Sequence, residues 1–145
     1  MQISSRFTIA IHVLICIETF KKDKKATSDF LASSVNVNPV VIRRLLQQLK
    51  TAGIVNVIRG SGGTEIAKPI DEITLLDIYN AVESVEDGNL FHFHDNPNKF
   101  CPIGKNIHNI LDVRLDKIQE AMEKEMKSVT IADIMNETKK LIGTE

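Results

Sequence analysis

Cysteine, tyrosine and tryptophan are scarce in this chain, whose 145 residues include two Cys, one Tyr and no Trp. Two cysteines that lie 85 residues apart do not form the framework of a disulfide-stabilised secreted domain. Long apolar runs are missing too, since no stretch reaches the ~18 residues that a membrane-spanning helix needs, and no signal peptide is recognisable. We therefore expect a soluble cytoplasmic protein with reduced thiols and no membrane partner.

Catalytic signatures are also missing. The GSGG at 60–63 lacks the Lys-Ser/Thr pair of a phosphate-binding P-loop, and no parallel βαβ unit surrounds it. No Ser-His-Asp order or pair of catalytic carboxylates is recognisable, and the only thiol–histidine pairing would join Cys101 to His92 or His108. We therefore expect a protein that is not an enzyme.

Charge is distributed unevenly along the chain. Residues 1–69 hold 10 Lys and Arg against 4 Asp and Glu, a net of +6, whereas residues 70–145 hold 8 against 15, a net of −7. A basic half joined to an acidic half indicates that only the first half meets a polyanion. Chance clustering is the alternative, but the basic half also contains the helix described next.

The segment NVNPVVIRRLLQQL at 36–49 predicts a recognition helix. Asn38 is a good N-cap, Pro39 a good first helical residue, and Gly53 stops the helix after Ala52. The inward face is apolar and consists of Ile42, Leu45, Leu46 and Leu49. The outward face carries Val40, Arg44, Gln47 and Thr51, flanked by Arg43 and Gln48. Cations suit phosphates, amides suit base edges and a methyl group suits thymine, although an ordinary solvated helix is the alternative.

The segments on either side complete a helix-turn-helix with a wing. Thr27 or Ser28 caps a short helix, and a three-residue turn containing Asn36 leads to the recognition helix. Two short strands at 54–59 and 64–68 enclose the glycine-rich tip and predict a β-hairpin. The alternation of the first strand turns one of two pairs toward the core, either Ile54 with Val57 or Val55 with Ile58.

Two further helices carry more apolar surface than a small domain covers. The helix at 3–20 is apolar on two opposite faces, so we expect its second face, which includes Cys16, to need another element, for example from a second copy. Residues 103–128 predict a rod about 38 Å long. Its apolar stripe consists of Ile103, Ile107, Leu111, Leu115, Ile118, Met122, Met126 and Val129. We expect the same helix of a second subunit to cover this stripe, with folding back onto its own domain as the alternative.

The blocks NPVVIRRLLQQLKTAGIV, GSGGTEIAKP and ITLLDIYNAVE resemble the Rrf-two family of bacterial winged-helix transcription regulators. FTIAIHVL near the start and CPIGKNI before the long helix extend the resemblance over nearly the whole chain. It implies a mainly α fold with a small β-hairpin wing, a winged helix-turn-helix domain plus a long dimerisation helix. It also implies a sequence-specific homodimer that binds a palindromic operator in double-stranded DNA and represses nearby promoters.

The implied organisation has three parts. Residues 1–84 would form the DNA-binding domain with its wing at 54–68, residues 85–102 a sensor-type loop, and residues 103–145 the dimerisation helix and a C-terminal helix. Cluster-binding members of the family place three cysteines in this loop, with a histidine helping. This chain has only Cys101 there and Gly104 where that histidine would follow, and a cluster needs three or four donors, so we expect no iron–sulfur cluster and no other cofactor. Thr64 stands where the family often has an aromatic ring, which makes wing packing through that ring doubtful.

Residues expected to contact DNA come from all parts of the predicted DNA-binding domain. Arg44 and Gln47 are expected to reach base edges, while Arg43 and the hydroxyl groups near the short helix contact phosphates. Arg59 would contact a phosphate or the minor groove. The full expected set is Ser4, Ser5, Arg6, Thr27, Ser28, Asn38, Pro39, Val40, Arg43, Arg44, Gln47, Arg59 and Ser61.

Cys101 is the first candidate for a sensing residue. It lies near Lys99 and Lys105 at the start of a helix, and both positive charge and a helix N-terminus lower the pKa of a thiol. Oxidation of this thiol would release DNA, whereas a packed loop cysteine is the alternative. Cys16 is the second redox candidate, although a small core residue is its more ordinary role.

Histidines near Cys101 form a loose set of metal-type donors with Asp95, namely His92, His94 and His108. In a strand-like stretch the H-x-H spacing would place two rings on one side, but zinc sites usually show tighter pairs, so we expect no metal. A metal-responsive regulator using His92, His94 and Cys101 remains an alternative to the redox-responsive repressor. A dimer of the same fold with no sensing role is another.

Overall fold

A computed structural model describes residues 3–60, 62–83 and 88–143. Ser61 and residues 84–87, where the expected sensor-type loop begins, lie outside the described residues. The elements in chain order are α1 (Ser5–Phe20), α2 (Ser28–Val35), α3 (Pro39–Thr51), β1 (Val55–Ile58), β2 (Gly63–Ile66), the 3-10 helix η1 (Ile70–Glu72), α4 (Leu75–Val82), α5 (Pro102–Ser128) and α6 (Ile131–Ile142). The mainly helical fold with one antiparallel two-stranded hairpin is confirmed. No helix in the described part of the chain is long and apolar enough to cross a membrane.

Most of the helices start at residues that the sequence marks as caps. The side-chain oxygen of Ser4 accepts from the Arg6 N–H, and Thr27 and Asn38 bond the first turns of α2 and α3 in the same way. Thr74 and Thr130 form complete capping boxes with Asp77 and Asp133 at the starts of α4 and α6. Each such bond satisfies an amide that has no partner inside the helix, so these boundaries agree with the prediction to within a residue or two.

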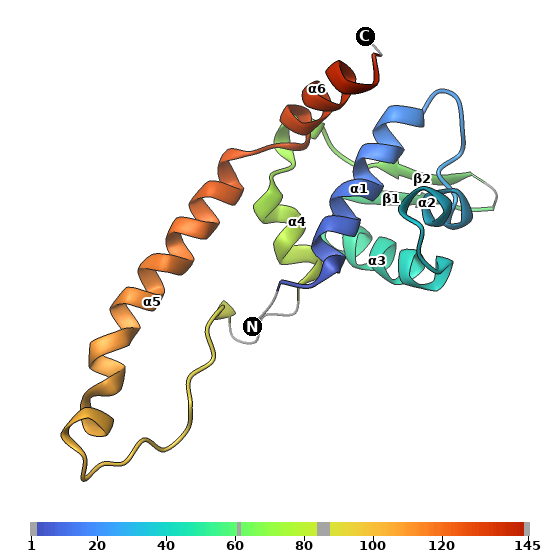
Figure 1. The fold of residues 1–145 in the computed structure, drawn as a ribbon. Helices are drawn as coiled ribbons and strands as arrows, with labels where there is room; N and C mark the ends of the chain where they lie inside the picture. The colour runs from blue at the N-terminus through green and yellow to red at the C-terminus, as the bar shows by residue number, and fades with distance from the viewer. Residues whose placement is uncertain (1–2, 61, 84–87, 144–145) are drawn as a thin grey trace.

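Helix α1 runs through the middle of the folded domain (Figure 1). Helices α2, α4 and α6 and strand β2 all pack against it, so both of its apolar faces are covered by its own chain. Cys16 is only 5% exposed, and its sulfur lies 3.2 Å from the Ser34 hydroxyl of α2. The expectation that the second face and Cys16 lie at an interface with another copy is therefore wrong.

The base of the hairpin does not follow the predicted strand alternation. Ile54 and Val55 are both buried, whereas Val57 and Ile58 are both exposed. Ile54 belongs to the end of α3, because its N–H bonds to the Leu49 carbonyl (3.0 Å) after Gly53 turns the chain with φ +76°. This pattern is a Schellman motif, which places the residue after the glycine against the core regardless of strand period. Val57 and Ile58 lie farther along the hairpin, beyond the core.

Asn36 makes the turn between α2 and α3. Its φ of 65° and ψ of 50° are left-handed, and its N–H bonds to the Ala32 carbonyl at 2.8 Å. Asparagine tolerates this conformation better than most residues other than glycine, which explains how the turn forms without a glycine.

Helix α5 is a rod that projects away from the domain (Figure 1). Its 27 residues span about 40 Å. Helix α4 packs against α5, and none of the residues of α5 is buried. At its C-terminal end the chain is fixed to the domain, since the N–H groups of Leu75 and Ile131 bond to the carbonyls of Val129 and Ile73, both at 2.9 Å. Figure 1 shows the loop that precedes α5 running beside the other end of the rod.

Candidate nucleic-acid interface

Helix α3 presents its polar face to solvent. Ile42, Leu45, Leu46 and Leu49 are buried as predicted, and the outward residues Val40, Arg43, Arg44, Gln47 and Thr51 are exposed. The Asn38 cap fixes one end of the helix and the Schellman motif fixes the other. The cationic face is therefore held in place by a rigid core, as a surface that must fit a DNA groove requires.

A groove of about 350 Å³ separates α3 from the hairpin. Arg43 and Gln47 line it from α3, Thr27 and Ser28 from the start of α2, and Val57 and Ile58 from β1. We call this hollow the wing groove. The Thr27 hydroxyl oxygen accepts from the Phe30 N–H at 3.1 Å, which leaves its O–H free to donate. Among the described residues that line the wing groove there is no carboxylate, and the charged side chain there is that of Arg43.

The hairpin is held against the start of α2 by its backbone. The Thr64 N–H bonds to the Ala26 carbonyl at 3.0 Å, and Thr64 itself is buried. Gly63 has φ +78°, and a Cβ there would lie 2.9–3.0 Å from backbone atoms of Ala26. At Thr64, which is not aromatic, the hairpin is therefore held by backbone contact with Ala26.

A second hollow, of about 440 Å³, lies on the other side of the outward face of α3. Arg6 from α1 lines it together with Val41, Arg44 and Gln47. The structure thus places Arg6, in the first turn of α1, next to Arg44 and Gln47, which are expected to contact base edges. Val41 was not among the predicted contacts, yet it is exposed beside Val40 at the start of α3.

Glu83 was also missed by the sequence prediction. Its carboxylate accepts a hydrogen bond from the Ser4 hydroxyl (2.8 Å), and it lies 4.0 Å from the Arg6 guanidinium. Burial and the charges of Glu83 and Glu123 raise the pKa of the neighbouring Tyr79. Glu83 therefore ties Ser4 and Arg6 to the end of α4. No sequence signal pointed to this contact, which joins residues 79 positions apart.

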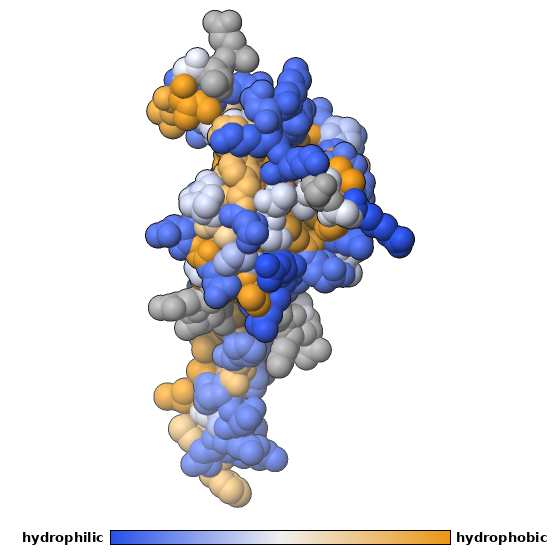
Figure 2. Space-filling view, turned by 90° about the vertical axis from the view of Figure 1, so that its right-hand side faces the viewer, coloured by the Kyte–Doolittle hydropathy of each residue, from blue (hydrophilic) through white to orange (hydrophobic). Residues whose placement is uncertain are grey.

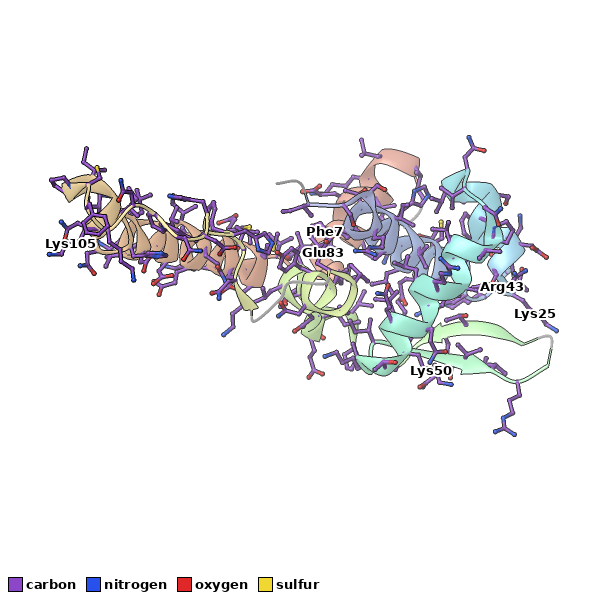
Figure 3. The ribbon with its side chains drawn as sticks, turned by 90° about the horizontal axis from the view of Figure 1, so that it is seen from below. Phe7, Lys25, Arg43, Lys50, Glu83 and Lys105 are labelled. Carbon is purple, nitrogen blue, oxygen red and sulfur yellow. The ribbon has the colours of Figure 1, made fainter. Side chains whose placement is uncertain are left out.

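The remaining expected contacts lie around these two hollows. Asn38 caps α3 with Pro39 in its first turn, Ser5 is exposed at the start of α1, and Arg59 is exposed near the tip of the hairpin. No ion pair within the described residues involves Arg43, Arg44 or Arg59. Figure 3 shows Arg43 and Lys25 at the end of the molecule opposite to Lys105, which lies near the free end of α5.

Cys101 is the N-cap residue of α5 and is half-exposed. The backbone amides of Gly104 and Ile103 lower the pKa of its thiol. The predicted direction agrees with this finding, but the cause is the helix N-terminus rather than Lys99 or Lys105.

The predicted metal-type donors are not brought together. The stretch around His92 and His94 is not a strand, and the Phe93 ring stacks with both His94 and His108, at centroid distances of 5.0 and 3.8 Å. Within residues 3–60, 62–83 and 88–143, no three His, Cys, Asp or Glu side chains are grouped as a metal site would need.

Comparisons with known proteins agree over nearly the full length. A family model described as "Rrf2: Iron-dependent Transcriptional regulator" matches residues 3–137. The "Putative HTH-type transcriptional regulator YwnA" of Bacillus subtilis (strain 168) is 43% identical over 134 residues, covering 92% of this chain and 97% of YwnA. A crystal structure of "a putative DNA binding protein" is 38% identical with a TM-score of 0.72, covering 90% of this chain and 99% of that one. T. potens IscR has the same fold, with a TM-score of 0.72 at 17% identity over 97% of this chain and 90% of its own.

The iron in the family description does not fit the donors of this chain. An iron–sulfur cluster needs three or four ligands, mostly thiolates. The chain has two cysteines, of which Cys16 is buried between α1 and α2 while Cys101 lies at the start of α5. One subunit therefore supplies a single accessible thiolate.

Proposed function

Since this chain belongs to the Rrf2 family, whose members are DNA-binding transcriptional regulators and not enzymes, we propose that it is a homodimeric repressor of a palindromic operator. The wing groove carries the proposal. It gathers two hydroxyl groups from the start of α2 and a guanidinium and an amide from α3 around one hollow beside the hairpin, and no carboxylate lines it among the described residues. Such a set suits a DNA backbone and the edges of its bases.

The side chains divide by the part of DNA that they would contact. Arg43, Thr27 and Ser28 are assigned to phosphates, because they lie beside the hairpin at the rim of the reading surface. Arg44 and Gln47 are assigned to base edges in the major groove, since both are exposed on the central outward face of α3. Arg59, near the hairpin tip, is assigned to a flanking phosphate or the minor groove.

Helix α5 is assigned to dimerisation. Ile103, Ile110, Val113 and Ile118 are 50–67% exposed on a rod with no buried residue. Apolar surface also lies along the narrow lower part of the molecule in Figure 2. A second α5 would cover this surface and hold two α3 helices about 34 Å apart, one turn of DNA. Binding in this way would exclude other proteins from the promoter.

Redox control through Cys101 is a second part of the proposal. The observation that favours it is a half-exposed thiol with a lowered pKa at the start of the dimerisation helix. A peroxide would oxidise its thiolate, as the sulfur attacks one oxygen, the O–O bond breaks and hydroxide leaves with the electron pair. The product is a sulfenic acid at the N-terminus of α5.

The test is selection of duplexes from a random pool, followed by fluorescence anisotropy with the selected and a scrambled duplex. We expect a palindrome bound about a thousandfold or more tightly than the scramble. Affinity should fall steeply with salt, with a slope of log Kd against log salt near 5 if the dimer neutralises about six phosphates. Absence of an enriched palindrome, or affinity independent of salt, would refute the proposal.

A further inference from the structure

The loop before α5 contacts this helix at two places, with a hollow between the two contacts. At the first place the Gln119 amide acts as a double clamp. Its Oε1 accepts from the Leu90 N–H at 2.9 Å, and its Nε2 donates to the Gly88 carbonyl at 2.7 Å. Glu123 accepts a second bond from the same Nε2 at 3.1 Å, which fixes the orientation of the amide.

At the second place two rings stack. The Phe93 ring of the loop lies 3.8 Å from the ring of His108 on α5, with an angle of 25° between their planes. The Phe93 ring also stacks with His94, at a centroid distance of 5.0 Å. His108 Nδ1 in turn lies 3.4 Å from a carboxylate oxygen of Asp112, one turn further along α5.

A cavity of about 250 Å³ remains between the two clamps. Asn89, Phe91 and Phe93 line it from the loop, and Asp112, Leu115 and Asp116 line it from α5. We call it the loop cavity. His108 and Gln119 of α5 also line it, so its walls hold two phenyl rings, an imidazole, one aliphatic side chain, two amides and two carboxylates one turn apart on α5.

Two carboxylates line the loop cavity, together with the His108 ring that contacts one of them. Among the described residues, no Lys or Arg lines it. The only ion-pair partner of Asp112 within the described residues is the His108 ring, and Asp116 has no such partner there. The surrounding half of the chain, residues 70–145, carries a net charge of −7. A cation inside the cavity would therefore gain attraction from two carboxylates and from the Phe91 ring.

The volume and lining of the loop cavity indicate which kind of cation would bind there. A metal ion prefers three or more donors, and no such group exists in the part of the chain that the structure describes. Phe91, Phe93 and Leu115 instead offer apolar contact, which an organic body would use. A volume of about 250 Å³ is slightly below the usual range for drug-sized ligands, so the occupant is small.

We infer that the loop cavity binds a small organic ammonium ion that carries an aromatic or short aliphatic group. The ammonium lies between Asp112 and Asp116, and the apolar group lies against Phe91 and Leu115. The bound ion adds a contact between the loop and the dimerisation helix. Its use as a signal for the repressor rests on the proposed function, whereas the binding itself does not.

The test is isothermal titration calorimetry of the full chain without DNA, using 2-phenylethylammonium and its neutral analogue 2-phenylethanol. We expect the ammonium to bind with a Kd below about 1 mM and the alcohol to bind about tenfold more weakly. The double variant Asp112→Asn, Asp116→Asn should bind the ammonium about tenfold more weakly. The matched control is Glu120→Gln, an exposed carboxylate of α5 outside the cavity, which should bind normally.

A second variant guards against misfolding of the first. Phe91→Ala keeps both carboxylates and should also weaken binding of the ammonium, with an unchanged circular dichroism spectrum. Equal binding of the alcohol, full binding by the double asparagine variant, or no heat at millimolar ligand overturns the inference. Anisotropy with the selected operator on the same samples separates the two proposals. The calorimetry is done without DNA, so a failure of DNA binding does not affect the measured affinity for the ammonium.

Discussion

At the scale of single residues, Gly63 and Gly60 make a matched pair in the hairpin. Both have positive φ, +78° and +79°, but a Cβ at Gly63 would meet the Ala26 backbone, whereas one at Gly60 would meet nothing within 4 Å. We expect Gly60→Ala to cost about 1–2 kcal/mol of unfolding free energy from backbone strain alone. Gly63→Ala should cost about 1–3 kcal/mol more, because the hairpin must move off α2. Urea unfolding measures both values, and equal losses would show that the contact with Ala26 does not hold the wing.

Arg43 and Arg44 are adjacent but face different hollows, the wing groove and the hollow beside Arg6. We expect Arg44→Ala to remove about 1–3 kcal/mol of preference for the operator over a scrambled duplex. Arg43→Ala should weaken binding to both duplexes by a similar factor, since phosphates carry no sequence. Anisotropy with the two duplexes distinguishes these results. Identical profiles for the two variants would contradict the division of roles.

Cys101 should react as a thiolate at lower pH than an ordinary cysteine, because amides at the start of α5 lower its pKa. The rate of alkylation by iodoacetamide follows the thiolate fraction. The rate for the native protein should therefore reach its plateau at lower pH than the rate for the chain in urea. Cys101→Ser should remove the fast reaction, because Cys16 is buried. Coincident pH profiles for native and unfolded chains would contradict a lowered pKa.

At the scale of elements, the sequence predicted most of what local signals determine. Capping residues, Pro39 and Gly53 mark helix ends through their own backbone chemistry, and the period of α3 separates its buried from its exposed face. The same reasoning failed at Ile54 and Val55, because helix termination and strand alternation overlap there. It also failed for the second face of α1, since α6, which lies more than 100 residues later in the chain, packs against α1 together with the neighbouring α2.

The exposed stripe of α5 gives the prediction that belongs to this scale. Ile110→Asp places a charge in the expected interface, where burial without a partner costs several kcal/mol. The dimer dissociation constant should rise about 100-fold or more. Sedimentation velocity over a range of concentrations measures the change. Leu141→Asp is the matched control, an exposed apolar residue on α6 that should leave association unchanged. A dimer that tolerates Ile110→Asp would place the interface elsewhere.

At the scale of the whole molecule, the proposed DNA-binding surface around Arg43 and the free end of α5 near Lys105 lie at opposite ends (Figure 3). The unequal charge of the two halves of the sequence anticipated this separation. Contacts between distant residues were not predictable, because Glu83 with Ser4 and Gln119 with the loop leave no periodic or motif signal. The sequence could name the residue types of the proposed DNA-binding surface. Their arrangement around the wing groove could not be predicted, because it depends on where the hairpin packs.

The central claim is that two copies of this chain, joined through α5, place two α3 helices in successive major grooves of one operator. Hydroxyl-radical footprinting of the selected duplex tests it most directly. The account predicts two protected patches on each strand, related by the symmetry of the palindrome and about 10 base pairs apart. A single protected patch, or uniform cleavage at protein concentrations that saturate the anisotropy signal, would contradict it.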